Sequence, residues 1–374
     1  MLTITNFGAT HAPYAGLVTE LHQNTLVVGG GIIGLASAFQ IARSGRSVTL
    51  FDPTPARGAT WAAAGMLAPS AEIGPGEEQN YQLQRGAVVA WRRLSDELAA
   101  VTGRHVTIHE TGTLVVGWDA SDRRLLKQFI DQATLLRAPL QVVSRSESPE
   151  LFVGLSDRIG EGVVMSDDAW LDPDEAVVEL MDALRVVGVD FVEEQVELIG
   201  ADESGVFAQT SNSRFSGRLG ILATGSVSLP RGAAPTGRHS IRPVRGMTVR
   251  VQGVDRSAQP TVRAFIRGRA FYMVSRPGGY CVLGATSDER REPVIEVGEL
   301  QRALRDALDI VPSLETAALV DTRVGLRPAS EDLRPFFEEW VDLGWAWSSG
   351  HYRHGITLAP LAALEALHYA ERRS

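Results

Sequence analysis

Arg353 is the residue whose type and setting most directly indicate binding chemistry. It lies in the segment GHYRHG at positions 350–355, just before apolar residues at helical spacing, Leu358, Leu361 and Leu364. A guanidinium there can hold a carboxylate through two parallel N–H···O bonds, which fixes orientation as well as charge. A solvated surface arginine is the alternative, since all but one of the 36 basic residues are arginine.

A glycine-rich turn near the N-terminus predicts a dinucleotide site. The segment GGGIIG at 29–34 follows the apolar run 25–28 and precedes a helical pattern at 35–42. Its glycines permit a tight turn, a close backbone approach to a pyrophosphate, and close helix packing, while the helix N-terminus attracts the phosphates. A carboxylate at the end of the next strand can accept hydrogen bonds from ribose hydroxyls. The predicted cofactor contacts are Gly29, Gly31, Ile32, Ile33, Gly34 and Asp52.

A stretch of small residues at 57–69, RGATWAAAGMLAP, favours a flavin over a nicotinamide cofactor. Small side chains cannot fill a core, but they can lie along a rigid, extended cofactor and leave backbone amides free to bind it. A flexible linker is the alternative, although Trp61 and Leu67 call for burial. The predicted contacts here are Thr60, Ala63, Ala64, Gly65 and Met66.

The elements that must position these residues alternate along the chain. Strand patterns occur at 25–28, 47–52 and 219–225. Between the second and the third, a helix is predicted that begins after Asp172 and ends at Gly188. Residues 81–167 are predicted to be largely helical, with a strand-like break at 105–116. Residues 242–286 alternate as strands, with turns at 267–268 and 277–279.

This pattern predicts an α/β fold, in which a Rossmann-like FAD-binding domain carries an inserted antiparallel-sheet α+β substrate domain. The FAD-binding domain is expected to comprise 25–80, 168–232 and 322–374, and the substrate domain 81–167 and 233–321. Residues 1–24 are expected to form an N-terminal extension.

Composition excludes several classes of function. The formal net charge of −9 and the absence of a dense basic block argue against nucleic acid as a partner. Lys127 is the one lysine and looks solvated, which disfavours a Schiff base. Cys281 is the one cysteine, and His105 and His109 sit in a strand-like pattern, so no metal site is predicted. No apolar stretch reaches membrane-spanning length and no secretory signal is recognisable, so we expect a cytoplasmic protein without membrane contact.

Several motifs, in order along the chain, resemble the D-amino-acid oxidase superfamily of FAD-dependent oxidoreductases. The segments 28–34 and 58–69 and the carboxylate of Asp52 look like its FAD-binding start, and the ending AAGMLAP resembles the glycine oxidases associated with thiamine biosynthesis. The resemblance returns downstream in YMVSRP (272–277), VLGAT (282–286), GLRP (325–328) and GHYRHGITLAP (350–360).

The resemblance implies roles for individual residues. Arg353 matches the arginine that pairs with the substrate carboxylate, Arg327 a second arginine of the same site, and Tyr272 an active-site tyrosine. The resemblance further implies FAD contacts at Val196, Ala223, Thr224, Gly225, His351, Tyr352, Arg353, His354, Gly355, Ile356 and Thr357. No cysteine occupies the C-terminal flavin segment, so we expect the flavin to be bound non-covalently.

The activity that the resemblance implies is oxidation of glycine or another small amino acid by hydride transfer to flavin. The imine hydrolyses to glyoxylate and ammonia, and dioxygen reoxidises the flavin to give hydrogen peroxide. No general base is needed, and His351 and His354 are expected to bond backbone or cofactor. The resemblance also implies a homotetramer and a hand-off of product to thiazole synthase.

Departures from the family pattern keep alternatives open. Residues 329–338 lack the usual glycines, His354 stands where asparagine is usual, and Ser287 replaces a methionine. The loop at 329–339 must therefore take another path, and the expected substrate widens from glycine to a small amino acid in general. The alternatives are a D-amino-acid or sarcosine oxidase of the same fold, a dehydrogenase that passes electrons to a quinone or carrier protein, and a non-catalytic FAD-fold binding protein.

Overall fold

A six-stranded sheet forms the centre of the first half of the molecule. The computed structural model describes residues 24–74, 78–284 and 286–373, so the predicted N-terminal extension lies outside the described residues except for Asn24. Five strands are parallel and the edge strand β18 is antiparallel. Their order is β18 (Phe336–Trp340), β19 (Trp345–Ser349), β12 (Leu219–Leu222), β1 (Thr25–Val28), β2 (Val48–Phe51) and β8 (Asp190–Val192).

The two faces of this sheet are covered by different layers. On β1, Val27 faces helices while Leu26 and Val28 face a small antiparallel sheet, as the two-residue period of a strand requires. The small sheet consists of β9 (Leu198–Asp202), β10 (Gly205–Gln209) and β11 (Arg214–Gly217). A buried strand between two layers explains why its sequence is continuously apolar.

Four helices pack on the other face. α1 packs against α7 and α5, and α3 packs against the same two helices. They are α1 (Ile32–Arg43), α3 (Glu78–Thr102), α5 (Pro173–Val186) and α7 (Gly355–Arg372). As predicted, Asp172 caps α5 by accepting a hydrogen bond from the Asp174 N–H, at 2.9 Å, and Gly188 follows the helix at φ +78°.

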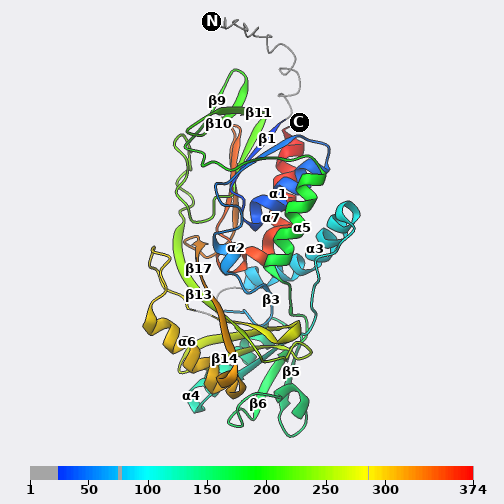
Figure 1. Cartoon of the computed structure of the whole chain (residues 1–374), viewed down its shortest axis with the longest axis vertical. Helices are drawn as coiled ribbons and strands as arrows, with labels where there is room; N and C mark the ends of the chain where they lie inside the picture. Colours follow the sequence, from blue (N-terminus) through cyan, green and yellow to red (C-terminus); the bar gives the residue numbers. More distant parts are fainter. Residues whose placement is uncertain (1–23, 75–77, 285, 374) are drawn as a thin grey trace, which may run out of the picture.

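An eight-stranded sheet dominates the second half, in the lower part of Figure 1, with α4 and α6 beside it. β13 and β17 run from this sheet toward the helical half. The strand order is β17 (Ala318–Ala329), β13 (Arg242–Gln252), β16 (Tyr280–Gly284), β15 (Arg269–Arg276), β14 (Thr261–Ile266), β4 (Thr113–Gly117), β6 (Glu161–Met165) and β5 (Leu140–Ser144). The helices are α4 (Ala120–Leu135) and α6 (Val297–Ile310).

Alternation along these strands separates a core face from a polar face. Val262, Ala264 and Met273 point into an apolar core that also contains Ala307 and Ile310 of α6. Arg263 and Tyr272, a directly opposite pair on β14 and β15, therefore point to the other side of the sheet. That side faces the half that contains the six-stranded sheet, where the short α2 (Ala59–Ala62) contacts β17 and β13.

The predicted α/β class is confirmed, with a mainly parallel sheet in one half and a mainly antiparallel sheet in the other, and with two local differences. Residues 140–165 contain β5 and β6 rather than helix, because the valine pairs of LQVVS and EGVVM favour strand over helix. The break at 105–116 forms a strand only from Thr113, after a single bridge between His109 and Trp170. A further short sheet pairs β3 (Met66–Leu67) with β7 (Ala169–Trp170).

The predicted domain boundaries remain a prediction, and the packing of α3 suggests one change to them. The apolar residues Trp91, Leu94 and Leu98 of α3 belong to the core beneath the six-stranded sheet. We therefore propose that α3 belongs to the FAD-binding half. Within the described residues, no helix combines the length and apolar character that crossing a bilayer requires.

Candidate functional site

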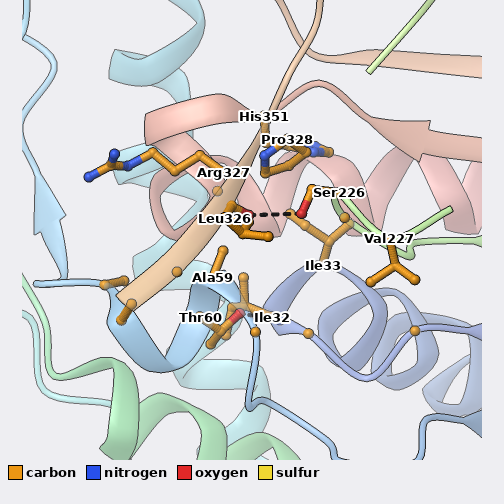
Figure 2. A pocket seen from close by; sticks show the side chains of 18 of the residues that line it. Ile32, Ile33, Ala59, Thr60, Ser226, Val227, Leu326, Arg327, Pro328 and His351 are labelled. Atoms are coloured by element: carbon orange, nitrogen blue, oxygen red, sulfur yellow. Dashed lines mark hydrogen bonds between the residues drawn. The ribbon is translucent and has the colours of Figure 1, made fainter. Parts of the chain in front are cut away.

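A cavity of about 570 Å³ runs between the two halves of the molecule. At one end it is lined by Gly29, Asp52 and Val196, and at the other by Tyr272 and Arg327. Figure 2 shows Ile32 and Ile33 of α1 and Ala59 and Thr60 of α2 opposite Leu326 and Arg327 of β17. The two predicted sites, for a dinucleotide and for a carboxylate, therefore share one cavity.

The dinucleotide end is built on the turn between β1 and α1. Gly29 has φ +108°, a conformation that L side chains rarely adopt. A Cβ on Gly34 would overlap the carbonyl oxygen of Gly29, so this glycine allows the close contact of helix and turn. Gly34 itself does not line the cavity, which agrees with a packing role rather than a contact.

Two side chains hold this turn in place. The Asp52 carboxylate accepts hydrogen bonds from the Gly30 N–H at 2.6 Å and the Thr54 N–H at 2.8 Å. The Thr60 hydroxyl accepts from the Ile32 N–H at 3.1 Å and so caps the start of α1. Both residues also line the cavity, next to the helix N-terminus that favours phosphate groups.

Buried arginines fix the small-residue segment along the cavity by its carbonyl groups. Arg250 donates to the carbonyls of Trp61 and Ala63, each at 3.3 Å, and Arg276 donates to that of Ala64 at 3.3 Å. The Thr248 hydroxyl donates to the Ala62 carbonyl at 3.0 Å. These bonds turn a stretch without large side chains into a rigid wall, so the flexible-linker interpretation is wrong.

Two glycines make room for the substrate-side residues. Gly284 is the cross-strand partner of Tyr272, and a Cβ on it would overlap the tyrosine ring. A Cβ on Gly246 would likewise overlap the Arg327 guanidinium. Arg327 donates weakly to the carbonyls of Arg245 at 3.4 Å and Thr286 at 3.3 Å, which directs it across β13. Tyr272 and Arg327 thus each lie over a glycine of the neighbouring strand.

Tyr272 is poised as a hydrogen-bond donor. Burial raises the pKa of Tyr272 to about 12, and the charge of Arg327 opposes that rise only in part. The phenol therefore keeps its proton at neutral pH and can donate to a carboxylate.

Glu72 is the carboxylate at this end of the cavity, and its side chain is 17% exposed. Burial alone would raise its pKa, but the charges of Arg353, Arg263 and Arg327, together with that of His354 when acid protonates it, outweigh burial, so the pKa is lowered. The Arg353 Nε lies 4.0 Å from the Glu72 carboxylate, and the His354 Nδ1 lies 3.3 Å from it. Glu72 is therefore ionised among arginines that surround it from several elements.

The two histidines before α7 are neutral. Burial lowers the pKa of His351 to about 4, and burial likewise lowers the pKa of His354 to about 4 although Glu72 pulls the other way. His354 sits between Glu72 and the Gln84 amide, 3.4 Å from the latter. Both rings are neutral, and that of His354 has polar partners on two sides, which agrees with structural roles rather than proton shuttling.

Nearly all predicted site residues line the cavity, including all three substrate-side residues Tyr272, Arg327 and Arg353. The exceptions are Gly34, His354 and Thr357. Thr357 instead ties the first turn of α7 to the small-residue segment, through a 3.1 Å hydrogen bond to the Met66 carbonyl. The unusual segment 330–335 turns with Leu333 at φ +60° and leads directly into β18.

Sequence reasoning missed Glu72, Arg263 and Ala270, which line the substrate end. For Arg263 a signal existed: the predicted two-residue turn at 267–268 fixes the hairpin register and so places Arg263 opposite Tyr272. The structure also places Cys281 in the core on the face of the sheet turned away from the cavity. No group of three or more His, Cys, Asp or Glu residues suited to a metal ion occurs in 24–74, 78–284 or 286–373.

Comparison with known families identifies the chemistry of the cofactor end. The family model for FAD dependent oxidoreductase matches residues 24–368. The chain belongs to this FAD-dependent oxidoreductase family. A glycine oxidase from Geobacillus kaustophilus is 28% identical over 356 residues, which span 93% of this oxidoreductase and 92% of the relative.

Two further comparisons extend this result. The bifunctional protein ThiO/ThiG of a Synechocystis species is 30% identical over 352 residues, covering 91% of this oxidoreductase and 50% of that protein. The crystal structure of the Geobacillus kaustophilus glycine oxidase superposes with a TM-score of 0.84 at 26% identity, covering 94% of this chain and 96% of that one. The resemblance to glycine oxidases therefore extends from isolated motifs to most of the chain and to the fold.

Proposed function

We propose that this oxidoreductase oxidises glycine or another small amino acid, with FAD bound non-covalently in the cavity. The observation that carries the proposal is the continuity of the cavity from the Gly29 turn to Tyr272, Arg327 and Arg353. The relatives named glycine oxidase, similar over most of their length, support an amino acid as the substrate.

The residues present fit an FAD molecule. The turn at Gly29, the carboxylate of Asp52 and the N-terminus of α1 suit the adenosine and pyrophosphate, and the rigid wall at 61–64 suits an extended ring system. α7 begins at Gly355, which lines the cavity, so its N–H groups favour a reduced, anionic ring. The bound flavin would supply a two-electron acceptor for the hydrogen leaving the substrate Cα.

The protein's part in the reaction is to bind and orient the amino acid. Arg353 would hold the carboxylate and Tyr272 would donate to it, with Arg327 beside them. Among the described residues at this end of the cavity, the positive charges of Arg263, Arg327 and Arg353 exceed the single negative charge of Glu72. This excess favours the uncharged form of the substrate amine, whose lone pair is needed to expel hydride.

The products proposed for glycine are glyoxylate, ammonia and hydrogen peroxide. Hydrolysis of the imine would give the first two, and the two electrons removed from the substrate would reduce dioxygen to the third. We also propose a homotetramer, a cytoplasmic location and delivery of the product to a thiazole synthase. The last is supported by the bifunctional relative, of which this chain spans about half.

The small Ala270 and Ser287 at the substrate end favour a second candidate within the same class. They leave space beside Tyr272, which suits sarcosine or a D-amino acid as well as glycine.

The proposal is tested by spectra of the purified holoprotein. Glycine, sarcosine or D-alanine added without oxygen should bleach the flavin absorbance, and readmitted air should restore it with release of hydrogen peroxide. Arg353→Ala should lower kcat/KM by about 100-fold or more, since a charged, bidentate contact is lost, while bound flavin per chain stays unchanged.

Arg93→Ala is the matched control, because Arg93 is an exposed arginine paired with Glu97 on α3. Bleaching without peroxide would favour a dehydrogenase over an oxidase. If no amino acid bleaches the flavin, or if Arg353→Ala turns over at the wild-type rate, the corresponding assignment is wrong.

A further inference from the structure

We propose that the charge of Arg250, a residue behind the cavity wall, raises the electron affinity of the bound FAD. Arg250 does not itself line the cavity. Charges that a protein places close to a flavin ring tune how readily the ring accepts electrons. The inference rests on the proposed binding of FAD in the cavity and is independent of the choice of substrate.

Arg250 is a buried cation whose hydrogen-bond partners in the described part of the chain are neutral. It lies on β13 and is 1% exposed. Its Nη1 donates to the Thr248 hydroxyl at 2.8 Å, and its Nη2 donates to the carbonyls of Trp61 and Ala63 at 3.3 Å each. Among the described residues, its Nε has no hydrogen-bond partner and no carboxylate forms an ion pair with it.

The two arginines beside it are paired with carboxylates. Arg276 pairs with Asp172 at 2.6 Å, and Arg323 pairs with Asp174 at 3.0 Å and with Asp321 at 2.8 Å. The side chains of Asp174 and Asp321 are 50% and 37% exposed, so water screens their charges. The cluster as a whole is balanced in formal charge, but its negative charges are the screened ones and its unpaired positive charge is dry.

An unpaired guanidinium in this place is a cost to the folded chain. Burial and the charge of Arg323 lower the pKa of Arg250, and the charge of Asp174 opposes them only in part. A guanidinium nevertheless keeps its proton at neutral pH, so the charge persists. Neutral donors can hold carbonyls of the wall, as the Thr248 hydroxyl does at 3.0 Å. The charge of Arg250 therefore indicates a role beyond holding the wall.

The wall carries the effect of this charge toward the cavity. Ala63 and Ala64 line the cavity, and the carbonyl of the peptide that joins them accepts the hydrogen bond from Arg250. The C=O and N–H of a trans peptide point in opposite directions, so the N–H of Ala64 points away from the guanidinium. The wall that suits an extended ring system thus has a dry cation one peptide behind it, where charges act through a low dielectric.

A fixed cation in this position favours the reduced cofactor. The oxidised ring is neutral and the reduced ring is anionic, so the charge of Arg250 stabilises the reduced ring more than the oxidised one. This effect adds to that of the N–H groups at the start of α7.

Midpoint potentials of the holoprotein test the inference without any amino-acid substrate. Arg250→Gln keeps an N–H donor for the wall but removes the charge, and Arg250→Met removes both. In each variant, two-electron reduction measured against a reference dye should be disfavoured about tenfold relative to the wild type, which lowers the midpoint potential by about 30 mV. Arg250→Lys retains the charge and should change the same equilibrium constant by less than about threefold.

The matched control removes a wall contact without changing the net charge. Arg276 donates to the Ala64 carbonyl at 3.3 Å and pairs with Asp172. Arg276→Met combined with Asp172→Asn therefore loses this contact together with one charge of each sign, and asparagine can still cap α5. The reduction equilibrium of this double variant should stay within about threefold of the wild type. Bound FAD per chain and a thermal melt show that each variant is folded and loaded.

If the neutral variants of Arg250 keep the wild-type potential, or if the control lowers it as far as they do, the inference is wrong and Arg250 only shapes the wall. Should one neutral variant not fold, the other gives the same comparison. If both fail to fold while Arg250→Lys folds, the charge serves the fold, and the inference is likewise wrong. A wild-type protein that binds no FAD would overturn the proposed function, whereas a protein with the expected potentials that oxidises no amino acid would leave the present inference standing.

Discussion

At the scale of single residues, the substrate end depends on glycines as much as on the charged side chains. Arg327 and Tyr272 each lie flat over a glycine of the adjacent strand, where any Cβ would overlap them. The glycines thus determine where a guanidinium and a phenol can point, without touching a ligand themselves.

Gly246→Ala should displace the Arg327 guanidinium while leaving the fold intact, since the overlapping atoms are the far end of a flexible side chain. We expect KM for the amino-acid substrate to rise several-fold, about 3–10-fold, because one cationic contact is misplaced. Steady-state kinetics and a thermal melt of the holoprotein measure the two effects.

Gly86→Ala in α3 is the matched control, because a Cβ there meets no atom within 4 Å. It should leave KM unchanged and stabilise the protein slightly, as alanine favours helix. An unchanged KM in Gly246→Ala would show that substrate binding does not depend on the present position of the Arg327 guanidinium.

The residues that sequence reasoning located are those with local signals. Gly29, Asp52 and Arg353 stand in short motifs whose chemistry is independent of distant contacts, and all three line the cavity. Glu72 stands in no such motif, because its importance arises only when the segment after β3 and the start of α7 meet in space. Arg263 could be placed only through the register of the hairpin that pairs it with Tyr272.

At the scale of elements, α7 contains a proline that its neighbour α3 accommodates. Pro360 lies inside the helix and has no N–H to donate to the Ile356 carbonyl one turn earlier. The buried indole of Trp91 donates to that carbonyl instead, at 2.7 Å. The same bond fixes α3 to the turn of α7 that borders the cavity.

A double-mutant cycle tests this arrangement. Trp91→Phe should lower the free energy of unfolding by about 2–3 kcal/mol, from lost packing and an unsatisfied carbonyl. In a Pro360→Ala background the new N–H can satisfy the carbonyl, so the same change should cost about 1 kcal/mol less. Urea unfolding of the four proteins measures the difference, and equal costs in both backgrounds would contradict the role of the indole.

Element prediction succeeded where caps and turns are chemically explicit and failed where they are not. The Asp172 cap and the 267–268 turn lie where the sequence places them. β5 and β6 were missed because their short valine-containing runs, which follow a long helix, fit the helical and the strand period equally well. Only their pairing in the sheet identifies them as strands. The order of the eight-stranded sheet joins β14 to β4, about 150 residues apart, by pairing that no local pattern reveals.

At the scale of the whole molecule, two histidines are buried in their neutral form near the cavity between the two halves. His351 and His354 lie at the junction of β19 and α7, each 5% exposed or less. Burial holds the pKa of both at about 4, well below the value of about 6.5 that an unfolded chain shows.

The protein should therefore lose stability in mild acid. Between pH 6.5 and 4 the unfolded chain binds protons that the folded histidines do not, so the stabilisation is complete above pH 6.5 and declines as pH falls toward 4. Each histidine contributes at most one proton to this slope, about 1.4 kcal/mol per pH unit.

His354→Asn isolates one of these protons, because asparagine can still hydrogen-bond Gln84 or Glu72 but does not titrate. Urea unfolding at several pH values, followed by tryptophan fluorescence at constant FAD, should give a shallower pH dependence below pH 6.5 than wild type, by up to one proton. His105→Asn reports the effect of losing an exposed histidine beside Asp96. Parallel curves for His354→Asn and wild type would mean that His354 takes up its proton in the folded protein as readily as in the unfolded chain, which would contradict its low pKa.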